Sequence, residues 1–245
     1  MSTTPGPIPG KTLVQHARAA RTTIALKLSM AVSGAIFILF VLAHMYGNLK
    51  AFAGHDAFNT YSEHLREIGE PMLPHAGFLW IMRAILIVSL VVHVWSAVAL
   101  WRRSGTARTV KYQVKKNPNS SLSSRTMRWG GLAILLFVVW HLIEFTFVKV
   151  SVNPDATGAN ITQDPYNLVV ASFEVWWMTL IYLLAMLALG MHLHHGTFSA
   201  AQTLGLTTTV RRQRTWRRVG WVVAIVIAGG FSLVPIFVLA GVISR

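Results

Sequence analysis

The sequence contains no cysteine, and this absence excludes several kinds of redox and metal site. Its 245 residues cannot form a disulfide framework, a thiolate zinc site, an iron–sulfur cluster bound by this chain alone, or a covalently attached c-type haem. Charge is also scarce, because Asp, Glu, Lys and Arg make up 12% of the chain, whereas soluble proteins have about 25%. Acidic residues are the rarest, 8 against 22 basic ones, which gives a formal net charge of +14. Such a basic chain raises the question of nucleic acid, but a hydrophobic content of 53% argues against that partner, and we expect none.

Long apolar stretches take the place of the missing charge. A membrane-spanning helix needs roughly 20 apolar residues, and five stretches meet this length: 22–48, 77–101, 129–150, 169–196 and 216–242. The first follows a Pro/Gly-rich segment, with no short apolar core and small-residue cleavage site typical of a signal peptide, so we interpret it as a retained helix. The sequence therefore predicts a single all-α integral membrane domain, residues 1–245, with five transmembrane helices.

The few charges predict the orientation of these helices, because Lys and Arg of short loops accumulate on the cytoplasmic side. Most basic residues lie before the first stretch or in the second and fourth connections with their flanks: Lys11, Arg18, Arg21, Lys27, Arg102, Arg103, Arg108, Lys111, Lys115, Lys116, Arg125, Arg128, Arg211, Arg212, Arg214, Arg217 and Arg218. The acidic residues fall in the other connections or the outer halves of helices: Asp56, Glu63, Glu67, Glu70, Glu144, Asp155, Asp164 and Glu174. We expect a cytoplasmic N-terminus and an external C-terminus. The basic face either serves orientation alone or also docks an acidic soluble partner or anionic lipid.

Histidines are placed in a pattern that suggests a cofactor. Each of the first four stretches contains one deep histidine, namely His44, His93, His141 and His192, and His194 and His195 follow the last of these. An ionisable residue inside a membrane helix is by default a functional-site hypothesis. Because successive helices alternate in direction, His44 and His141 lie nearer the outside and His93 and His192 nearer the cytoplasm. A b haem bound by two imidazoles needs one histidine from each of two facing helices, so the pattern supplies two such pairs, stacked across the membrane.

At this point the chain resembles the dihaem cytochrome b membrane anchor, b558 type, of succinate dehydrogenases and fumarate reductases, in the version with one five-helix polypeptide. The resemblance covers nearly the whole chain. The motifs that carry it are Leu42-Ala43-His44, Asp56-Ala57-Phe58-Asn59, Val92-His93-Val94-Trp95, Trp140-His141-Leu142-Ile143-Glu144, His192-Leu193-His194-His195-Gly196-Thr197-Phe198-Ser199 and Gln202-Thr203-Leu204-Gly205.

This resemblance implies a fold and a set of ligands. The first four helices would surround two stacked b haems, and the fifth would be peripheral. His93 and His192 would bind the proximal haem, with His195 as the fallback ligand, and His44 and His141 the distal haem. Fumarate-reductase members carry a glutamate two residues before the ligand of the fourth helix, whereas this chain has Gly190, which favours succinate oxidation.

The resemblance also implies the partners and the reaction. A flavoprotein subunit would oxidise succinate, and an iron–sulfur subunit would bring the electrons to the basic cytoplasmic face. This chain would pass them through the haems to a membrane quinone, with menaquinone favoured. We expect a multi-pass protein of the cytoplasmic membrane of a bacterium, in contact with membrane lipid.

Quinone reduction consumes protons, so a site beside a haem should offer a proton-relay group. Glu144, one helical turn after His141, is the first candidate, and the alternative role for it is an ion pair with Arg83. Arg83 could equally pair with a haem propionate. Glu67 in the first external connection is a weaker candidate, as are Glu70 and His64. Ser29 and Ser33 would line a quinone pocket near the cytoplasmic side or serve helix packing.

Two other classes of function remain open at the level of sequence. One is a dihaem b subunit of another respiratory complex, although such subunits place two ligands on each of two helices. The other is a membrane transporter or anchor without redox chemistry, which would be colourless when purified.

Overall fold

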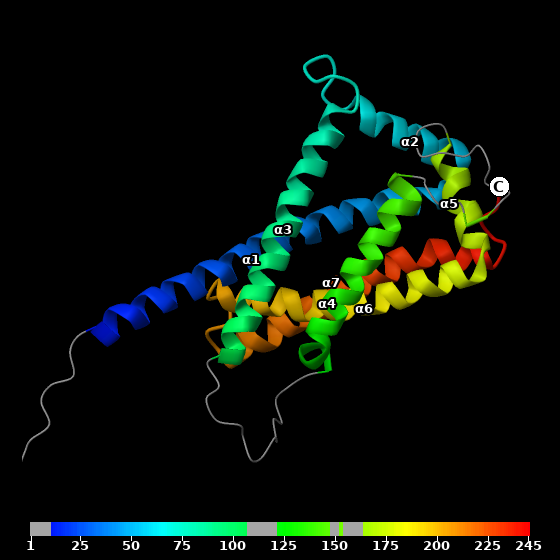
Figure 1. Cartoon of the computed structure of the whole chain (residues 1–245). Helices are drawn as coiled ribbons and strands as arrows, with labels where there is room; N and C mark the ends of the chain where they lie inside the picture. The colour runs from blue at the N-terminus through cyan, green and yellow to red at the C-terminus, as the bar shows by residue number, and fades with distance from the viewer. Residues whose placement is uncertain (1–10, 107–121, 148–151, 154–163) are drawn as a thin grey trace, which may run out of the picture.

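The computed structural model describes residues 11–106, 122–147, 152–153 and 164–245, and these fold into helices joined by short turns (Figure 1). Five helical segments are long and apolar enough to cross a membrane: Thr23–Ala53, Gly77–Ser104, Met127–Thr146, Trp176–Thr203 and Val210–Leu239. The described residues contain no strand. The prediction of an all-α membrane protein with five spanning helices is therefore confirmed.

The first span is longer than expected, and a further helix follows it. Helix α1 covers Lys11–Leu49 and continues as the 3-10 helix η1, Lys50–Ala53. Gly54 then reverses the chain with a φ of 92°, a conformation that favours glycine. Helix α2, His55–Glu67, forms where the sequence indicated only a loop. Its short length and polar composition explain why a search for apolar stretches did not find it.

The second span ends as an α-helix, whereas the third ends in a π turn. Helix α3 covers Gly77–Thr106, and α4 covers Leu122–His141. At His141 the α-helix passes into a single π turn, η2, Leu142–Thr146, and π turns are frequent at functional sites. Residues 148–150 of the predicted third stretch lie outside the described residues, as do Arg108, Lys111, Lys115, Lys116 and Asp155.

The predicted fourth stretch, 169–196, divides into two helices. Helix α5, Pro165–Glu174, begins at Asp164, whose side chain accepts a hydrogen bond from the backbone N–H of Asn167. Val175 is extended, with φ −82° and ψ 110°, and α6 follows as Trp176–Thr203. The fourth span therefore starts at Trp176 and extends beyond the histidine cluster.

Helix α7, Val210–Leu239, is the fifth span. The Thr209 side chain caps it by accepting from the backbone N–H of Arg212. It begins before the predicted residue 216 because arginines are good helix formers and do not interrupt the helix.

Helix α1 lies between α3 and the group formed by α4, α6 and α7. Helices α6 and α7 run side by side and share the most extensive contact, while α4 packs on α6, and α1 contacts both α6 and α7 (Figure 1). Helix α3 packs mainly on α1, and within the described residues it shares no extensive contact with α4 or α6. The fifth helix, expected at the periphery, places its Phe231 ring 5.6 Å from the ring of His44.

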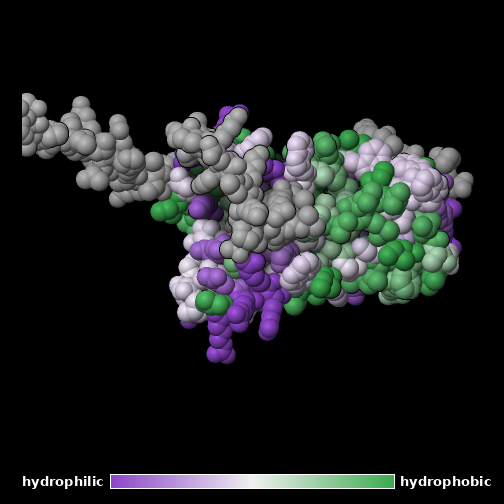
Figure 2. Space-filling view, turned by 90° about the horizontal axis from the view of Figure 1, so that it is seen from below, coloured by the Kyte–Doolittle hydropathy of each residue, from purple (hydrophilic) through white to green (hydrophobic). Residues whose placement is uncertain are grey.

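Most apolar side chains on the spans face outward. Large hydrophobic residues are exposed along every spanning helix, for example Leu39 at 69%, Val91 at 63% and Ile225 at 65%. Figure 2 shows this apolar surface over the middle and right of the molecule, with hydrophilic residues gathered toward the end at which α7 begins. Such a surface suits contact with lipid rather than water.

Candidate functional site

The first histidine pair joins α3 to α6. The rings of His93 and His192 lie with centroids 6.2 Å apart and planes inclined by 51°. Helices α1 and α4 pass beside these rings at glycines: a Cβ on Gly34 would lie 3.6 Å from Cε1 of His93, and one on Gly131 would lie 3.7 Å from Cε1 of His192. The absence of side chains at both glycines leaves space next to each imidazole.

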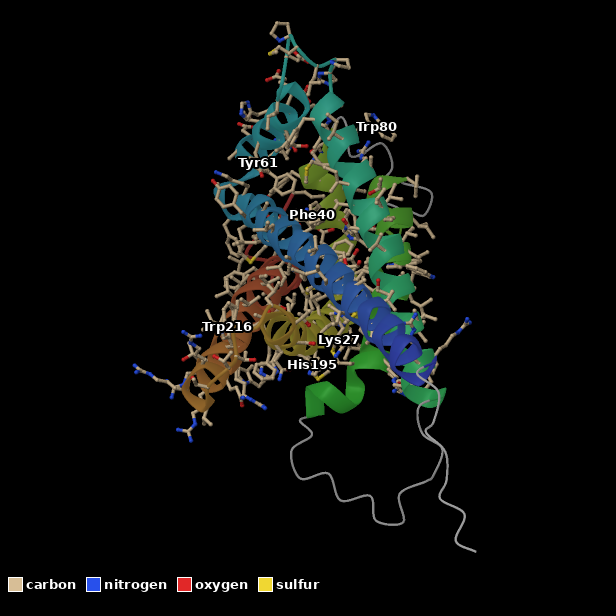
Figure 3. All side chains as sticks on the ribbon, turned by 90° about the vertical axis from the view of Figure 1, so that its left-hand side faces the viewer. Lys27, Phe40, Tyr61, Trp80, His195 and Trp216 are labelled. Atoms are coloured by element: carbon tan, nitrogen blue, oxygen red, sulfur yellow. The ribbon has the colours of Figure 1, made fainter. Side chains whose placement is uncertain are left out.

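The second pair joins α1 to α4. The rings of His44 and His141 have centroids 5.9 Å apart and planes inclined by 78°. Phe40 stacks on His44 at 5.4 Å, and Figure 3 shows it toward the C-terminal end of α1. The four histidines therefore come from four helices and meet as two separate pairs.

Hydrogen bonds select the tautomer of one histidine in each pair. The Ser33 hydroxyl donates to the carbonyl of Ser29 at 2.7 Å, so at 3.1 Å from His93 Nδ1 its oxygen is the acceptor. The Tyr182 hydroxyl donates to Glu144 Oε2 at 3.2 Å, so at 3.1 Å from His141 Nδ1 it too accepts. With the proton on Nδ1, Nε2 of His93 and of His141 carries the lone pair, as a neutral metal-binding imidazole requires.

The spacing within each pair matches two imidazoles on one metal ion. A metal–imidazole bond of about 2 Å on each side, together with roughly 1 Å from each ring nitrogen to its ring centre, gives about 6 Å between ring centres. The observed centroid separations are 5.9 and 6.2 Å. Within the described parts of the chain, no group of three or more His, Cys, Asp or Glu side chains could hold a metal ion. The donor sets therefore suit haem iron with two axial ligands better than a zinc ion with three or four protein ligands.

Unsatisfied polar atoms occur on the helical segments that carry the paired histidines. Buried side-chain atoms without a hydrogen-bond partner in the described structure are Ser96 Oγ, Trp140 Nε1, Glu144 Oε1, His192 Nδ1 and Thr197 Oγ1. Each belongs to a paired histidine or lies within five residues of one on the same helical segment. Buried polar groups normally have partners, so both pairs fit a site that binds a further group.

The three histidines of α6, His192, His194 and His195, point in different directions. His194 faces α7, where its ring stacks on Trp221 at 4.3 Å. No ring contact joins His195 to His93 among the described residues, whereas His192 makes one. Figure 3 shows His195 at the same end of the molecule as Lys27. The geometry therefore brings His192, and not the fallback His195, opposite His93.

The acidic residue near the second pair is deeply buried. Glu144 in the π turn η2 is 1% exposed. Tyr182 of α6 bonds one of its oxygens, and Ser172 of α5 adjoins the same carboxyl group. Sequence reasoning missed Tyr182, because nothing in the apolar stretch around it shows that its hydroxyl meets His141, 41 positions earlier.

The other predicted candidates are dispersed. Arg83 is exposed, with its guanidinium 4.7 Å from the ring centre of Trp80. No ion pair joins it to Glu144 among the described residues. Glu67 is exposed at the end of α2. Ser33 is 3% exposed and bonds a histidine, which is a more specific position than general pocket lining.

The motif Asp56 to Asn59 connects α2 to α5. The Asn59 amide donates to Asp164 Oδ1 at 3.0 Å and its oxygen accepts from the backbone N–H of Tyr166 at 3.0 Å. His55 Nε2 lies 3.2 Å from the same Asp164 oxygen. Burial alone would raise the pKa of Asp164, but the hydrogen bonds from Asn59, Asn167 and His55 lower it below its ordinary value. These contacts join α5 to α2 at the end of the bundle that carries Glu144.

Comparison with known proteins identifies the family. The family model described as the succinate dehydrogenase/fumarate reductase transmembrane subunit matches residues 102–232, just over half of the chain, from the end of α3 into α7. Searches of curated proteins and of solved structures find no significant match. The matched region contains His141, His192, Tyr182 and Glu144. The chain therefore belongs to the family of succinate dehydrogenase/fumarate reductase transmembrane subunits, the membrane anchors of these oxidoreductase complexes.

Proposed function

We propose that this chain binds two b haems, the proximal one through His93 and His192 and the distal one through His44 and His141. The observation that carries the proposal is the presence of two histidine pairs, at 6.2 and 5.9 Å, from four different helices. In this role the chain is the cytochrome b anchor of a succinate:quinone oxidoreductase. Succinate oxidation takes place on a flavoprotein subunit.

Haem iron supplies one-electron chemistry, so two haems would give electrons from a partner's iron–sulfur centre a route to a membrane quinone. The residues of this chain hold the ligands in place. Ser33 and Tyr182 accept from the Nδ1–H groups of His93 and His141 and so direct Nε2 of each ring toward the site. Phe40 and Phe231 cover His44 and exclude water from that side.

Glu144 is our candidate for proton transfer to or from the quinone. Reduction of a quinone to a quinol needs two electrons and two protons, and a positioned carboxyl group is a suitable proton carrier. Oε1 of Glu144 has no hydrogen-bond partner in the described structure, whereas Oε2 is held by Tyr182. Among the described residues, no comparable contact joins Arg83, Glu67 or Ser29 to a histidine pair, so we assign them no part in this step.

The partners would bind at the end of the bundle where the basic residues gather. Lys27, Arg102, Arg103 and Arg128 lie there at the adjoining ends of α1, α3 and α4. This charge complements an acidic iron–sulfur subunit, and the distribution of Lys and Arg supports a cytoplasmic position for this face.

Haem content tests this proposal. We expect the purified chain to show a reduced-minus-oxidised b-type absorption band and a ratio of two haems to one polypeptide. A colourless protein would eliminate the haem proposal and favour an anchor without redox chemistry. Co-purification of a flavoprotein and an iron–sulfur protein is expected in the same preparation, and their absence from the intact membrane complex would contradict the proposed assembly.

A further inference from the structure

The first three turns of α7 carry a high density of positive charge. Five arginines are all exposed here: Arg211, Arg212, Arg214, Arg217 and Arg218. Residues 176–245 contain no Asp or Glu, and none of these arginines forms an ion pair within the described part of the chain. Their charge is therefore available to an anion from outside the chain.

A recess of about 440 Å³ lies among these turns, lined by Leu206, Thr209, Arg211, Arg212, Thr215 and Trp216. Among the described residues, the Arg212 guanidinium contacts the hydroxyl of Thr208, at 3.3 Å, and no other acceptor, which leaves further N–H groups for an anion. The recess also borders the N-terminus of a 30-residue helix, where backbone N–H groups and the helix dipole favour negative charge. These features suit a phosphate group.

Apolar residues follow on the same helical face, beyond the exposed Arg218. Residues 211, 215, 218, 222 and 225 follow the three- and four-residue spacing of one helical face. Val222 is 60% exposed and Ile225 is 65% exposed. Trp216 lines the recess, and Figure 3 shows it beside side chains that project from the start of α7. Tryptophan is enriched at the membrane–water interface.

A ligand that matches this surface has an anionic head and an apolar tail. We propose that the recess binds the phosphate headgroup of an anionic phospholipid, with its acyl chains along Val222 and Ile225. A soluble acidic protein would match the arginines but not the adjoining apolar face. The proposal goes beyond the proposed electron-transfer function and does not depend on haem binding.

Native mass spectrometry of the intact complex, or of the full chain, tests the proposal with phosphatidylglycerol and phosphatidylcholine as probes. We expect wild-type protein to retain phosphatidylglycerol in preference to phosphatidylcholine. The double variant Arg211→Gln/Arg212→Gln should lose about tenfold or more of this preference. The matched control is Arg214→Gln/Arg217→Gln, which removes the same charge from the same helix at positions that do not line the recess, and its preference should stay within about twofold of wild type.

Four results would overturn the proposal. Equal retention of the two lipids by wild-type protein would remove the specificity. Equal losses in both double variants would indicate general surface charge. Displacement of the lipid by millimolar inorganic phosphate would indicate a site for free phosphate. Retention by the isolated chain but not by the intact complex would show that a protein partner covers the recess.

Discussion

Replacement of Tyr182 by Phe tests whether its hydroxyl holds His141 as an iron ligand. The hydroxyl accepts from His141 Nδ1 at 3.1 Å and donates to Glu144 Oε2 at 3.2 Å. Phe retains the ring, which packs edge-on against Phe137 at 4.8 Å and Phe173 at 4.9 Å. The substitution therefore removes two hydrogen bonds and little packing.

The expected change in reduction potential follows from the lost bond to Nδ1. An imidazole N–H that donates to an oxygen makes the ring a stronger electron donor and stabilises oxidised iron. One hydrogen bond contributes about 0.5 to 1.5 kcal/mol, and for a one-electron couple a tenfold change in the equilibrium constant, or about 1.4 kcal/mol, equals about 59 mV. The midpoint potential of the distal haem should rise by about 20 to 60 mV.

Potentiometric titration with optical detection measures both haems in one sample. The control is Tyr166→Phe, which removes another tyrosine hydroxyl, one that donates to the Ser244 carbonyl and touches neither histidine pair. If Tyr182→Phe retains both haems at unchanged potentials, or if Tyr166→Phe produces the same shift, the assigned role of Tyr182 is wrong. The variant should also be less stable by about 1 to 3 kcal/mol, because it leaves a buried carboxylate oxygen without its donor.

Three further predictions concern the first pair, the α6/α7 contact and the contact between α2 and α5. Ser33→Ala should raise the potential of the proximal haem alone, by about 20 to 60 mV, and a shift of the distal haem instead would contradict the pairing. Gly220→Ala should lower the melting temperature and reduce the free energy of unfolding by about 1 to 3 kcal/mol, because the new Cβ would lie 2.7 Å from the His194 carbonyl oxygen. The control is Gly229→Ala, whose Cβ would meet nothing within 4 Å. Hydrogen bonds to Asp56 and then Asp164 raise the pKa of His55. The stabilising contribution of His55 is therefore complete below the ordinary pKa of about 6.5 and is lost as the pH rises through the pKa of the folded state. An NMR titration that gives a pKa at or below about 6.5 for His55 would contradict this.

The sequence predicted those parts of the structure that follow from hydropathy. Five long apolar stretches are visible without any tertiary information, because the lipid environment requires them. The histidines within four of these stretches were visible in the same way. Alternation of helix direction was sufficient to group His44 with His141, and His93 with His192, and the structure brings these same residues together.

The remaining features depend on neighbours that a linear pattern does not reveal. Helix α2 is too polar to register as an apolar stretch, and the break at Val175 lies between two apolar helices. The contacts of Ser33 with His93 and of Tyr182 with His141 join positions 60 and 41 residues apart. Ser33 was noticed as a polar residue in a span, but its partner could be identified only from the packing of α3 on α1.

Replacement of the four histidines one at a time tests the central claim most directly. We predict that His44→Ala and His141→Ala each leave one haem with the same midpoint potential, and that His93→Ala and His192→Ala each leave the other haem, with a different potential. Haem content per folded polypeptide and a redox titration of each variant measure this result. Retention of two haems in all four variants, or a division of the variants into any other two groups, would contradict the account.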